Sequence, residues 1–237
     1  MKTLQAIKAT VRVAVIDCDP LRFLGFCALL SSESDLELQS VPLNEIGKHD
    51  DVGVCLLGSS PGGKVLEALT TLKTLRPGLD VIVTGCDMDD PAILRAIAAG
   101  AKGCIDETAS ASEFVQAIRI VQTGSVWAPR RVLSTLVEQS CASSEQLRSV
   151  GHRPFTSREM EVLAMLVTGC SNKEIAAPLG IEERTVKAHV AKLMRKVGVL
   201  NRVMLCVHVI KHSLVAPKPG PLQPFGLPQP AASGHLQ

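Results

Sequence analysis

The chain has 237 residues, of which 46% are hydrophobic and 20% are charged, so it is long enough for two domains with buried cores. It has no signal-peptide pattern at its N-terminus and no apolar run of about eighteen residues, so we expect a cytoplasmic protein with reduced cysteines. The eight cysteines form no Cys-x-x-Cys pair, and we expect no metal site and no cofactor.

The formal net charge of +2 is unevenly distributed along the chain. Residues 1–140 contain 13 Lys and Arg against 17 Asp and Glu, whereas residues 152–216 contain 10 against 5. Because a basic surface attracts the phosphate backbone of nucleic acids, the C-terminal part is the expected nucleic-acid-binding part.

Residues 11–124 alternate short apolar runs with amphipathic segments, which predicts an α/β domain. The expected strands cover 11–16, 36–41, 52–57, 81–84 and 103–105, and the expected helices cover 20–31, 64–75, 90–99 and 112–122. The link 42–50 is short and has no clear helical pattern. Crossovers of this length predict a doubly wound five-stranded parallel sheet, with any ligand site at the carboxyl ends of the strands.

Residues 125–152 are expected to form a linker that contains one short helix. We expect the chain's single tryptophan, Trp127, to anchor the start of the linker by packing. An amphipathic pattern predicts a helix over 130–139, and the Ser-rich stretch 140–152 predicts a flexible connection.

Residues 153–215 predict a small all-α domain of four helices. Thr156 and Glu159 form a capping box that starts the first helix at about Ser157. Ser171 caps a second helix over 172–179, in which Pro178 predicts a kink or an early end.

The third predicted helix, 183–197, has two contrasting faces. One face carries the apolar stripe Val186, Val190, Leu193 and Val197. The opposite face combines cations with small residues, namely Arg184, Lys187, Ala188, Ala191, Lys192 and Arg195. Small residues let a helix approach base edges, and the cations reach phosphates or guanine, so this face predicts DNA binding. A solvated basic face is the alternative interpretation.

These motifs resemble the LuxR-type (NarL/FixJ) helix-turn-helix family. The residues that carry the resemblance are Thr156-x-x-Glu159-x-x-Val162-Leu163, Ser171-Asn172-Lys173-Glu174-Ile175-Ala176, Thr185-Val186-Lys187-x-His189-Val190 and Asn201-Arg202. The resemblance implies that Thr185, Val186 and Lys187 enter the major groove and that Asn172 and Lys173 contact the DNA backbone. It also implies dimerisation through the fourth helix, 202–212, where Val203, Val207 and Ile210 share one face.

The N-terminal part resembles the receiver domain of bacterial response regulators. The resemblance rests on Val15-Ile16-Asp17-Cys18-Asp19-Pro20-Leu21, Val81-Ile82-Val83-Thr84-Gly85 and Ala98-Ala99-Gly100-Ala101-Lys102-Gly103. A working receiver accepts a phosphoryl group on an aspartate, with Mg²⁺ held by an acidic pair and a lysine that neutralises charge.

Most of this phosphorylation chemistry is missing from the chain. The acceptor position falls on Leu57, or on Gly58 if the alignment shifts by one residue. Of the acidic pair only Asp17 remains, because its partner position is Cys18.

The other receiver positions are also altered. The lysine position falls on Glu107, or on Asp106 after a one-residue shift, and the switch aromatic falls on Cys104, whereas Thr84 keeps the switch hydroxyl. We therefore expect a degenerate receiver that is not controlled by aspartyl phosphorylation, and we expect no enzymatic activity.

The combined prediction is a sequence-specific transcriptional regulator that binds double-stranded DNA as a homodimer. One alternative is an interaction protein whose receiver-like domain docks onto another regulator, a kinase or RNA polymerase. Another is a ligand sensor or a thiol sensor that uses Cys18, Cys86 and Cys104. The Pro-rich tail 216–237 is expected to be disordered.

Overall fold

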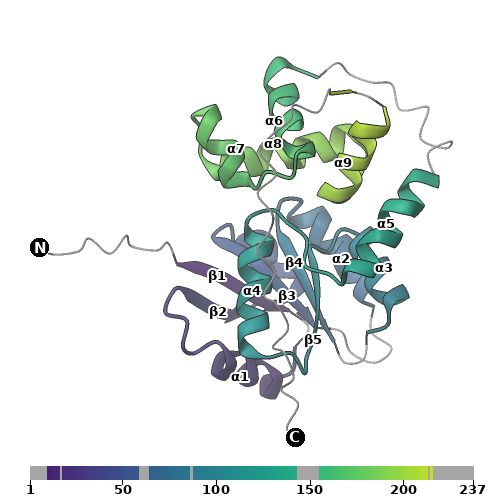
Figure 1. The fold of residues 1–237 in the computed structure, drawn as a ribbon. Helices are drawn as coiled ribbons and strands as arrows, with labels where there is room; N and C mark the ends of the chain where they lie inside the picture. Colours follow the sequence, from purple (N-terminus) through teal and green to yellow (C-terminus); the bar gives the residue numbers. More distant parts are fainter. Residues whose placement is uncertain are drawn as a thin grey trace, which may run out of the picture.

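The computed structural model describes residues 10–16, 18–58, 64–85, 88–142, 155–212 and 214–215. Asp17, Cys86, the tail 216–237 and most of the expected flexible connection 140–152 lie outside these ranges. Figure 1 shows an α/β domain below a smaller helical domain, with the helix α5 beside both.

The N-terminal domain is built on a parallel sheet with the strand order β2-β1-β3-β4-β5. Its strands are β1 (Val11–Ile16), β2 (Leu36–Ser40), β3 (Val52–Gly58), β4 (Asp80–Gly85) and β5 (Gly103–Asp106). The helices are α1 (Pro20–Leu29), α2 (Val65–Leu75), α3 (Asp90–Ala98) and α4 (Ala111–Gln122). The predicted doubly wound fold is confirmed, and the link 42–50 contains the 3₁₀ helix η1 (Leu43–Lys48).

Successive side chains along each strand point to opposite faces of the sheet, and helices bury both faces. Val13 and Val15 point to the face covered by α1 and α4, where the rings of Phe26 and Phe114 meet edge to face with centroids 5.4 Å apart. Ala14 and Ile16 point to the opposite face, which α2 and α3 cover. Burial on both sides explains why the strands read as continuous apolar runs in the sequence.

The segment after α4 joins the sheet before it forms a helix. Trp127 pairs with Gly103 at the outer edge of β5, and its half-buried side chain packs on the core, which confirms its expected role as an anchor. Helix α5 (Arg130–Ala142) extends three residues beyond the predicted end, and it packs Val132 and Leu136 against the core.

The helical domain consists of α6 (Ser157–Val167), α7 (Asn172–Leu179), α8 (Glu183–Val197) and α9 (Arg202–Lys211). The capping boxes of Thr156 and Ser171 are both present, and the predicted start of α6 is confirmed. The stripe Val186, Val190, Leu193 and Val197 is buried in the core of this domain, as predicted.

Pro178 does not shorten α7, so the predicted early end is wrong. The helix continues to Leu179, and Gly180 then adopts the left-handed conformation with φ 62°. Pro178 stands one residue before the helix ends, so its missing N–H removes a single hydrogen bond. The N–H groups of Gly180 and Ile181 close the end on the carbonyls of Ala177 and Ala176.

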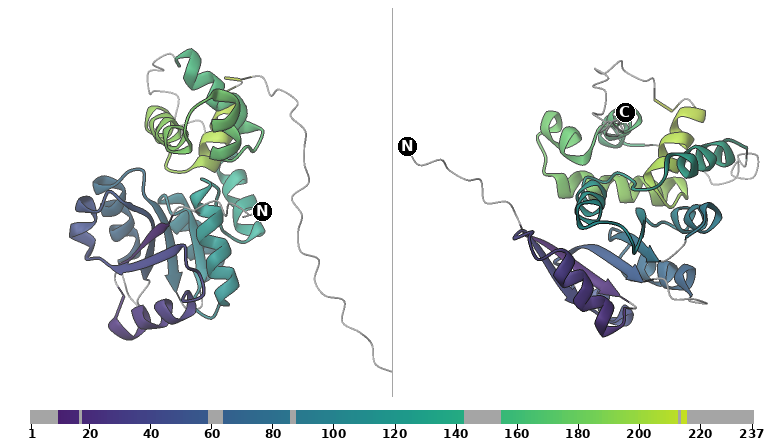
Figure 2. Two further views of the ribbon diagram at one scale, coloured as in Figure 1. Left: turned by 90° about the vertical axis from the view of Figure 1, so that its left-hand side faces the viewer. Right: turned by 60° about the horizontal axis from the view of Figure 1, so that its bottom comes forward.

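The two domains meet at one end of the sheet, as the views in Figure 2 show. Asp80, the first residue of β4, and Lys102, which precedes β5, both lie at this contact. It is therefore formed at the amino ends of the strands, whereas receiver chemistry belongs to the carboxyl ends. Among the helices of the described residues, none is both long and apolar enough to cross a membrane.

Glu159 connects the cap of α6 to the basic helix α8. Its carboxylate is 1% exposed, accepts the N–H of Thr156 at 2.9 Å and lies 2.7 Å from Nζ of Lys196 and 3.2 Å from Nζ of Lys192. The hydrogen bond from Lys196 and then that from the Thr156 backbone lower the pKa of Glu159 from 4.5 to about 2. The carboxylate therefore remains ionised in the folded domain under mildly acidic conditions.

We predict that acid destabilises the helical domain through Glu159. The stabilisation is complete above the ordinary pKa of 4.5 and is lost as the pH falls from there toward about 2. Glu159→Gln should lower the free energy of unfolding at pH 7 by about 2 kcal/mol, because a neutral amide replaces the carboxylate to which Lys196 and the Thr156 N–H bond. The pH dependence of urea unfolding checks this. Wild type should lose more stability between pH 6 and pH 3 than Glu159→Gln, and equal losses would contradict the assignment. Glu161→Gln, in an exposed pair with Arg158, is the control.

Candidate nucleic-acid interface

The predicted DNA-binding face of α8 is only partly open to solvent. Arg184 has 85% of its side chain exposed, and Ala188, Lys192 and Arg195 are also exposed. Arg184 forms an ion pair with Glu182 at the start of the helix. These residues form the accessible part of a basic surface that could reach phosphates.

Other predicted DNA contacts range from exposed to fully buried. Lys173 is exposed on α7, and Thr185 is half-buried near the N-terminus of α8. Val186 is fully buried in the domain core, so its structural role is packing between the helices.

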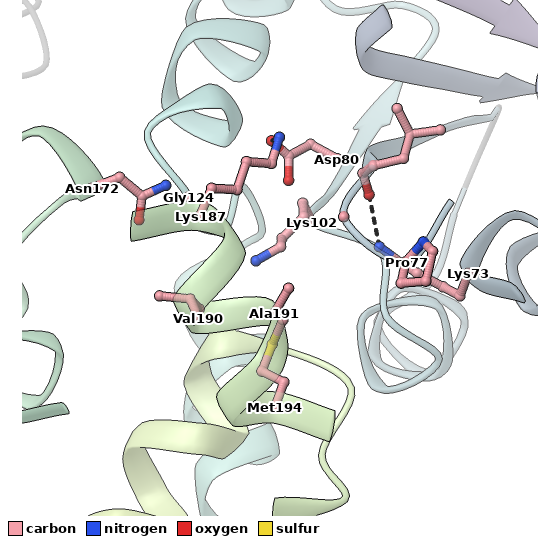
Figure 3. Close-up of a pocket in the computed structure, with 12 residues that line it drawn as sticks. Lys73, Pro77, Asp80, Lys102, Gly124, Asn172, Lys187, Val190, Ala191 and Met194 are labelled. Carbon is pink, nitrogen blue, oxygen red and sulfur yellow. Dashed lines mark hydrogen bonds and ion pairs between the residues drawn. The ribbon is translucent and has the colours of Figure 1, made fainter. Parts of the chain in front are cut away.

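Lys187 is bound to the receiver-like domain. Its Nζ donates a hydrogen bond to Oδ2 of Asp80 at 2.7 Å, and the Asp80 side chain is 4% exposed. Figure 3 shows both side chains beside a pocket that Val190, Ala191 and Met194 also line from the α8 side. The inner part of the predicted DNA-binding face therefore packs against the other domain.

Asn172 is also buried in the contact between the domains. Its N–H donates to the carbonyl of Thr123 at 3.1 Å, and its side chain lies against Gly124. A Cβ at Gly124, whose φ is +85°, would lie 2.7 Å from Nδ2 of Asn172, so only glycine permits this approach.

Asn201 completes the contact from the start of α9, and Arg202 supports Asn172 from within the helical domain. The Asn201 side chain accepts the N–H of Met204 through Oδ1 at 2.9 Å and donates through Nδ2 to the carbonyl of Ile97 at 3.0 Å. Arg202 donates to Oδ1 of Asn172 at 3.3 Å and to the carbonyl of Cys170. Residues that the sequence motifs place in the helix-turn-helix thus also hold the two domains together.

Sequence reasoning missed this contact. Asp80 is the residue that a pattern could have indicated, because it is an acid directly before a fully buried strand. The pattern around Gly124 indicates only a turn after a helix. The spacing of Asn172 and Asn201 does not indicate that either residue contacts another domain.

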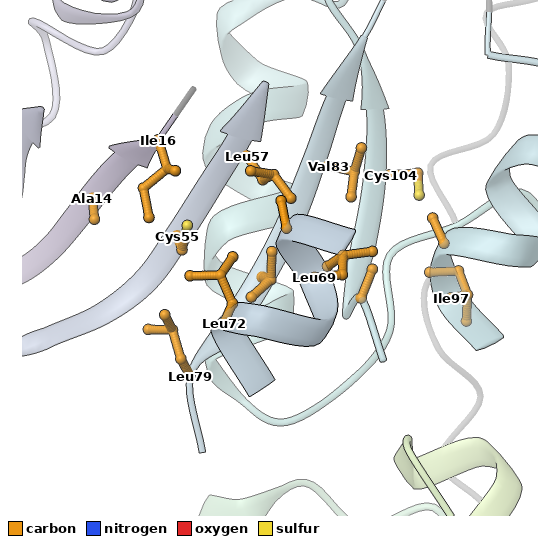
Figure 4. Close-up of a cluster of buried hydrophobic side chains, with 14 of the residues drawn as sticks. Ala14, Ile16, Cys55, Leu57, Leu69, Leu72, Leu79, Val83, Ile97 and Cys104 are labelled. Carbon is orange, nitrogen blue, oxygen red and sulfur yellow. The ribbon is translucent and has the colours of Figure 1, made fainter. Parts of the chain in front are cut away.

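The residues of the predicted degenerate receiver pocket lie at the opposite ends of the strands. Leu57 is fully buried in the apolar cluster drawn in Figure 4, close to Ile16 and Val83. The buried hydroxyl of Thr84 donates to the carbonyl of Leu57 at 3.5 Å. The predicted acceptor position therefore presents hydrocarbon, and the hydroxyl of Thr84 bonds to the backbone of the neighbouring strand.

In this predicted pocket a carboxylate follows β5 where a working receiver has its lysine, and the cation comes from α1. Glu107, which follows β5 at the lysine position, forms an ion pair with Arg22 of α1. Asp19 caps α1 by accepting the N–H groups of Leu21 and Arg22, each at 3.0 Å. The positive charge beside β5 thus comes from α1. Asp17, the remaining member of the acidic pair, lies outside the described residues.

The described thiols near the strand ends are poorly suited to sensing. Burial raises the pKa of Cys104 to about 12, and burial is also the main cause of the raised pKa of Cys18. Both therefore remain protonated at neutral pH, where a reactive cysteine needs its thiolate. Cys86 lies outside the described residues. Within the described ranges, no three His, Cys, Asp or Glu side chains are grouped closely enough to hold a metal ion.

A receiver-like parallel sheet followed by a capped helix-turn-helix with a basic face defines a DNA-binding regulator of the response-regulator class. The family model of bacterial regulatory proteins of the luxR family matches residues 153–209. The glycerol metabolism activator of Pseudomonas putida is 34% identical over 167 residues, which cover 68% of this chain and 75% of that protein. The chain therefore belongs to the LuxR family of bacterial regulatory proteins.

Two further proteins to which the chain is similar are named as response regulators. The response regulator protein VraR of Staphylococcus aureus is 28% identical over 215 residues, which cover 87% of this chain and 99% of that protein. The solved structure of ChrA, a response regulator in a heme-sensing two-component system, is 25% identical with a TM-score of 0.45 and covers 88% of this chain and 100% of that chain.

We predict that Asp80→Asn separates the domains by removing the carboxylate partner of Lys187. The radius of gyration from small-angle scattering should increase, and affinity for a cognate DNA site should rise roughly fivefold, within the usual range of coupling between two sites. Asp51→Asn is the control, because it removes an equal charge from an exposed pair with Arg12. Unchanged scattering and unchanged affinity in Asp80→Asn would show that this ion pair does not hold the domains.

Proposed function

We propose that this chain is a sequence-specific transcriptional regulator that reads DNA through α8 and works without aspartyl phosphorylation. The observation that carries the proposal is the basic face of α8, which projects from a helix-turn-helix whose caps and buried stripe are all formed. Such a face supplies cations to phosphates and small side chains to base edges. Because its target is genomic DNA, the proposed site of action is the cytoplasm.

The structure is a closed conformation with respect to DNA. Lys187 and Asn172, both proposed DNA contacts, are engaged with Asp80 and with the end of α4. A duplex that reached Lys187 would occupy the space of the receiver-like domain. In the proposed mechanism, DNA binding therefore follows separation of the domains.

Dimerisation is the second part of the proposal. A single helix-turn-helix reads few base pairs, and a homodimer reads two half-sites one helical turn apart. On α9, Ile210 is exposed, whereas Val203 packs against the core of the receiver-like domain. Separation of the domains would expose Val203 and extend the apolar face that the two copies are proposed to share.

Phosphorylation is an unsuitable switch for this opening. Leu57 offers no oxygen for a phosphoryl group or for Mg²⁺, and Glu107 places a negative charge where phosphate would need a cation. The proposed controls are domain separation, dimerisation, a ligand or a partner.

One observation favours an interaction role as a second candidate function. Leu21 and Leu24 on α1 are 79% and 62% exposed and lie on the receiver-like domain, away from the helical domain. Such a surface suits docking onto another regulator or RNA polymerase. If that role dominates, the protein should bind DNA weakly and should lose partner binding when both leucines are replaced by Gln.

We predict that Lys187→Ala weakens binding to a cognate site about tenfold, the usual effect of removing one good base or phosphate contact. The measurement belongs in the Asp80→Asn background, because in wild type the same change also breaks the closed contact. Titration of a labelled duplex at two salt concentrations gives both the affinity and the salt dependence. Lys48→Ala is the control, with an exposed lysine of the receiver-like domain. Equal affinities in the two variants would exclude Lys187 as a DNA contact.

We predict that the protein gains no mass when it is incubated with a small phosphodonor and Mg²⁺. Leu57 cannot form an acyl phosphate, and Glu107, paired with Arg22, stands where a phosphoryl group would need a lysine. Intact-protein mass spectrometry before and after acid treatment checks this. An acid-labile increase by one phosphoryl group would show that another carboxylate serves as the acceptor.

A further inference from the structure

Three lysine side chains from both domains converge on one small cavity. Lys73 comes from α2, Lys102 from the turn before β5, and Lys187 from α8 (Figure 3). The buried guanidinium of Arg202 lies close enough to influence Lys102. Among the described residues that line the cavity, Asp80 carries the single carboxylate, so the protonated site has a net positive charge.

Two of the three ammonium groups have protein partners. Nζ of Lys73 donates to the carbonyl of Leu79 at 2.8 Å, and Nζ of Lys187 donates to Asp80 at 2.7 Å. Lys102 is only 6% exposed, yet its Nζ makes no hydrogen bond or ion pair within the described part of the chain. Figure 3 shows the Lys102 side chain directed toward α8, between Lys187 and Ala191. An ammonium group on a side chain so largely withdrawn from water, beside other cations, is stabilised by a counter-charge.

The electrostatic surroundings also favour a bound negative charge. Burial and then the charge of Lys102 lower the pKa of Lys73 to about 8. Burial lowers the pKa of Lys102 as well, although the nearby charge of Asp80 opposes the shift. An anion in the cavity would stabilise the protonated form of both lysines.

The size of the cavity limits what can occupy it. Its volume is about 20 Å³, on the order of that of one water molecule or one monatomic ion. Phosphate, sulfate and organic carboxylates are larger than this. The remaining wall is largely apolar, with Val190, Ala191 and Met194 on the side of α8.

We propose that this cavity is a binding site for one small inorganic anion of the size of chloride, held by Lys102 from the receiver-like domain and by Lys187 from α8. The anion bridges the two domains and stabilises the closed conformation. Because the same Lys187 is a proposed DNA contact, chloride and DNA compete for it through linked equilibria. Chloride then acts as an effector of DNA binding in addition to its general screening of phosphate contacts.

The direct test is the ³⁵Cl NMR line width of sodium chloride solutions that contain the full-length protein. Wild type should broaden the chloride signal saturably, and Lys102→Met should abolish the saturable part. Lys48→Met removes the same charge from an exposed lysine and should behave as wild type. Equal broadening by the Lys102 and Lys48 variants would overturn the proposal, as would the absence of saturable broadening by wild type, which would indicate water in the cavity.

A second variant keeps the test decisive if Lys102→Met does not fold. Gly124→Ala places a methyl group against Asn172 and should separate the domains without changing any lysine. Chloride broadening should disappear in this variant once scattering shows that it is open. Broadening that persists in an open protein would place the anion elsewhere and overturn the proposal.

The consequence for DNA binding rests on the proposed function and is tested separately. Replacing chloride by gluconate at constant ionic strength should raise DNA affinity about fivefold more for wild type than for Lys102→Met. An equal gain in both proteins would contradict the linkage to DNA. If the protein does not bind DNA but the saturable chloride broadening is present, the proposed function fails and the anion site stands.

Discussion

The arrangement of the two domains depends on the buried carboxylate of Asp80. A carboxylate that is 4% exposed is stabilised by cations, and the one that bonds to it directly is Lys187 of the other domain. Neither domain alone provides this pairing. The ion pair therefore links a charge of the sheet to the position of α8. The hydrogen bonds of Asn172 and Asn201 further fix the orientation of the two domains.

The two ends of the sheet carry different arrangements of charged side chains. At the carboxyl ends, the pair of Arg22 and Glu107 reverses the usual placement of acid and base and leaves a hydrocarbon at the acceptor position. At the amino ends, lysines from two domains surround one acid. The charges of the receiver-like domain that bear on α8 are thus gathered at the interdomain contact, at the far end of the sheet from the predicted degenerate phosphorylation pocket.

Much of the fold could be predicted from local patterns. Each cap and each apolar stripe depends on one helix and its immediate neighbours. The caps Thr156 and Ser171 and the stripe of α8 therefore predicted the bounds of these helices almost to the residue. The strands were predicted to within one residue at each end because apolar runs buried on both faces have few alternatives. Of the two effects predicted for Pro178, a kink or an early end, the early end was wrong, because its position one residue before the helix end limits the damage to one hydrogen bond.

The candidate site was less predictable, because its partners lie about a hundred residues apart in sequence. The Lys187 face was recognisable as basic, but the pairing with Asp80 depends on how two separately folded units meet. The burial of Lys102 depends on the same contact. The spacing of residues within one helix carries no information about a contact between two domains.

The side chain of Asn201 has a role in both domains at once. Its Oδ1 caps α9 and belongs to the folding of the helical domain, whereas its Nδ2 bonds to Ile97 and belongs to the closed contact. When the domains part, the cap remains, while the amide proton that bonds to Ile97 exchanges its protein acceptor for water. The side-chain amide resonance of this one residue is therefore a natural spectroscopic reporter, which distinguishes an open, folded regulator from a closed one without any label attached to the chain.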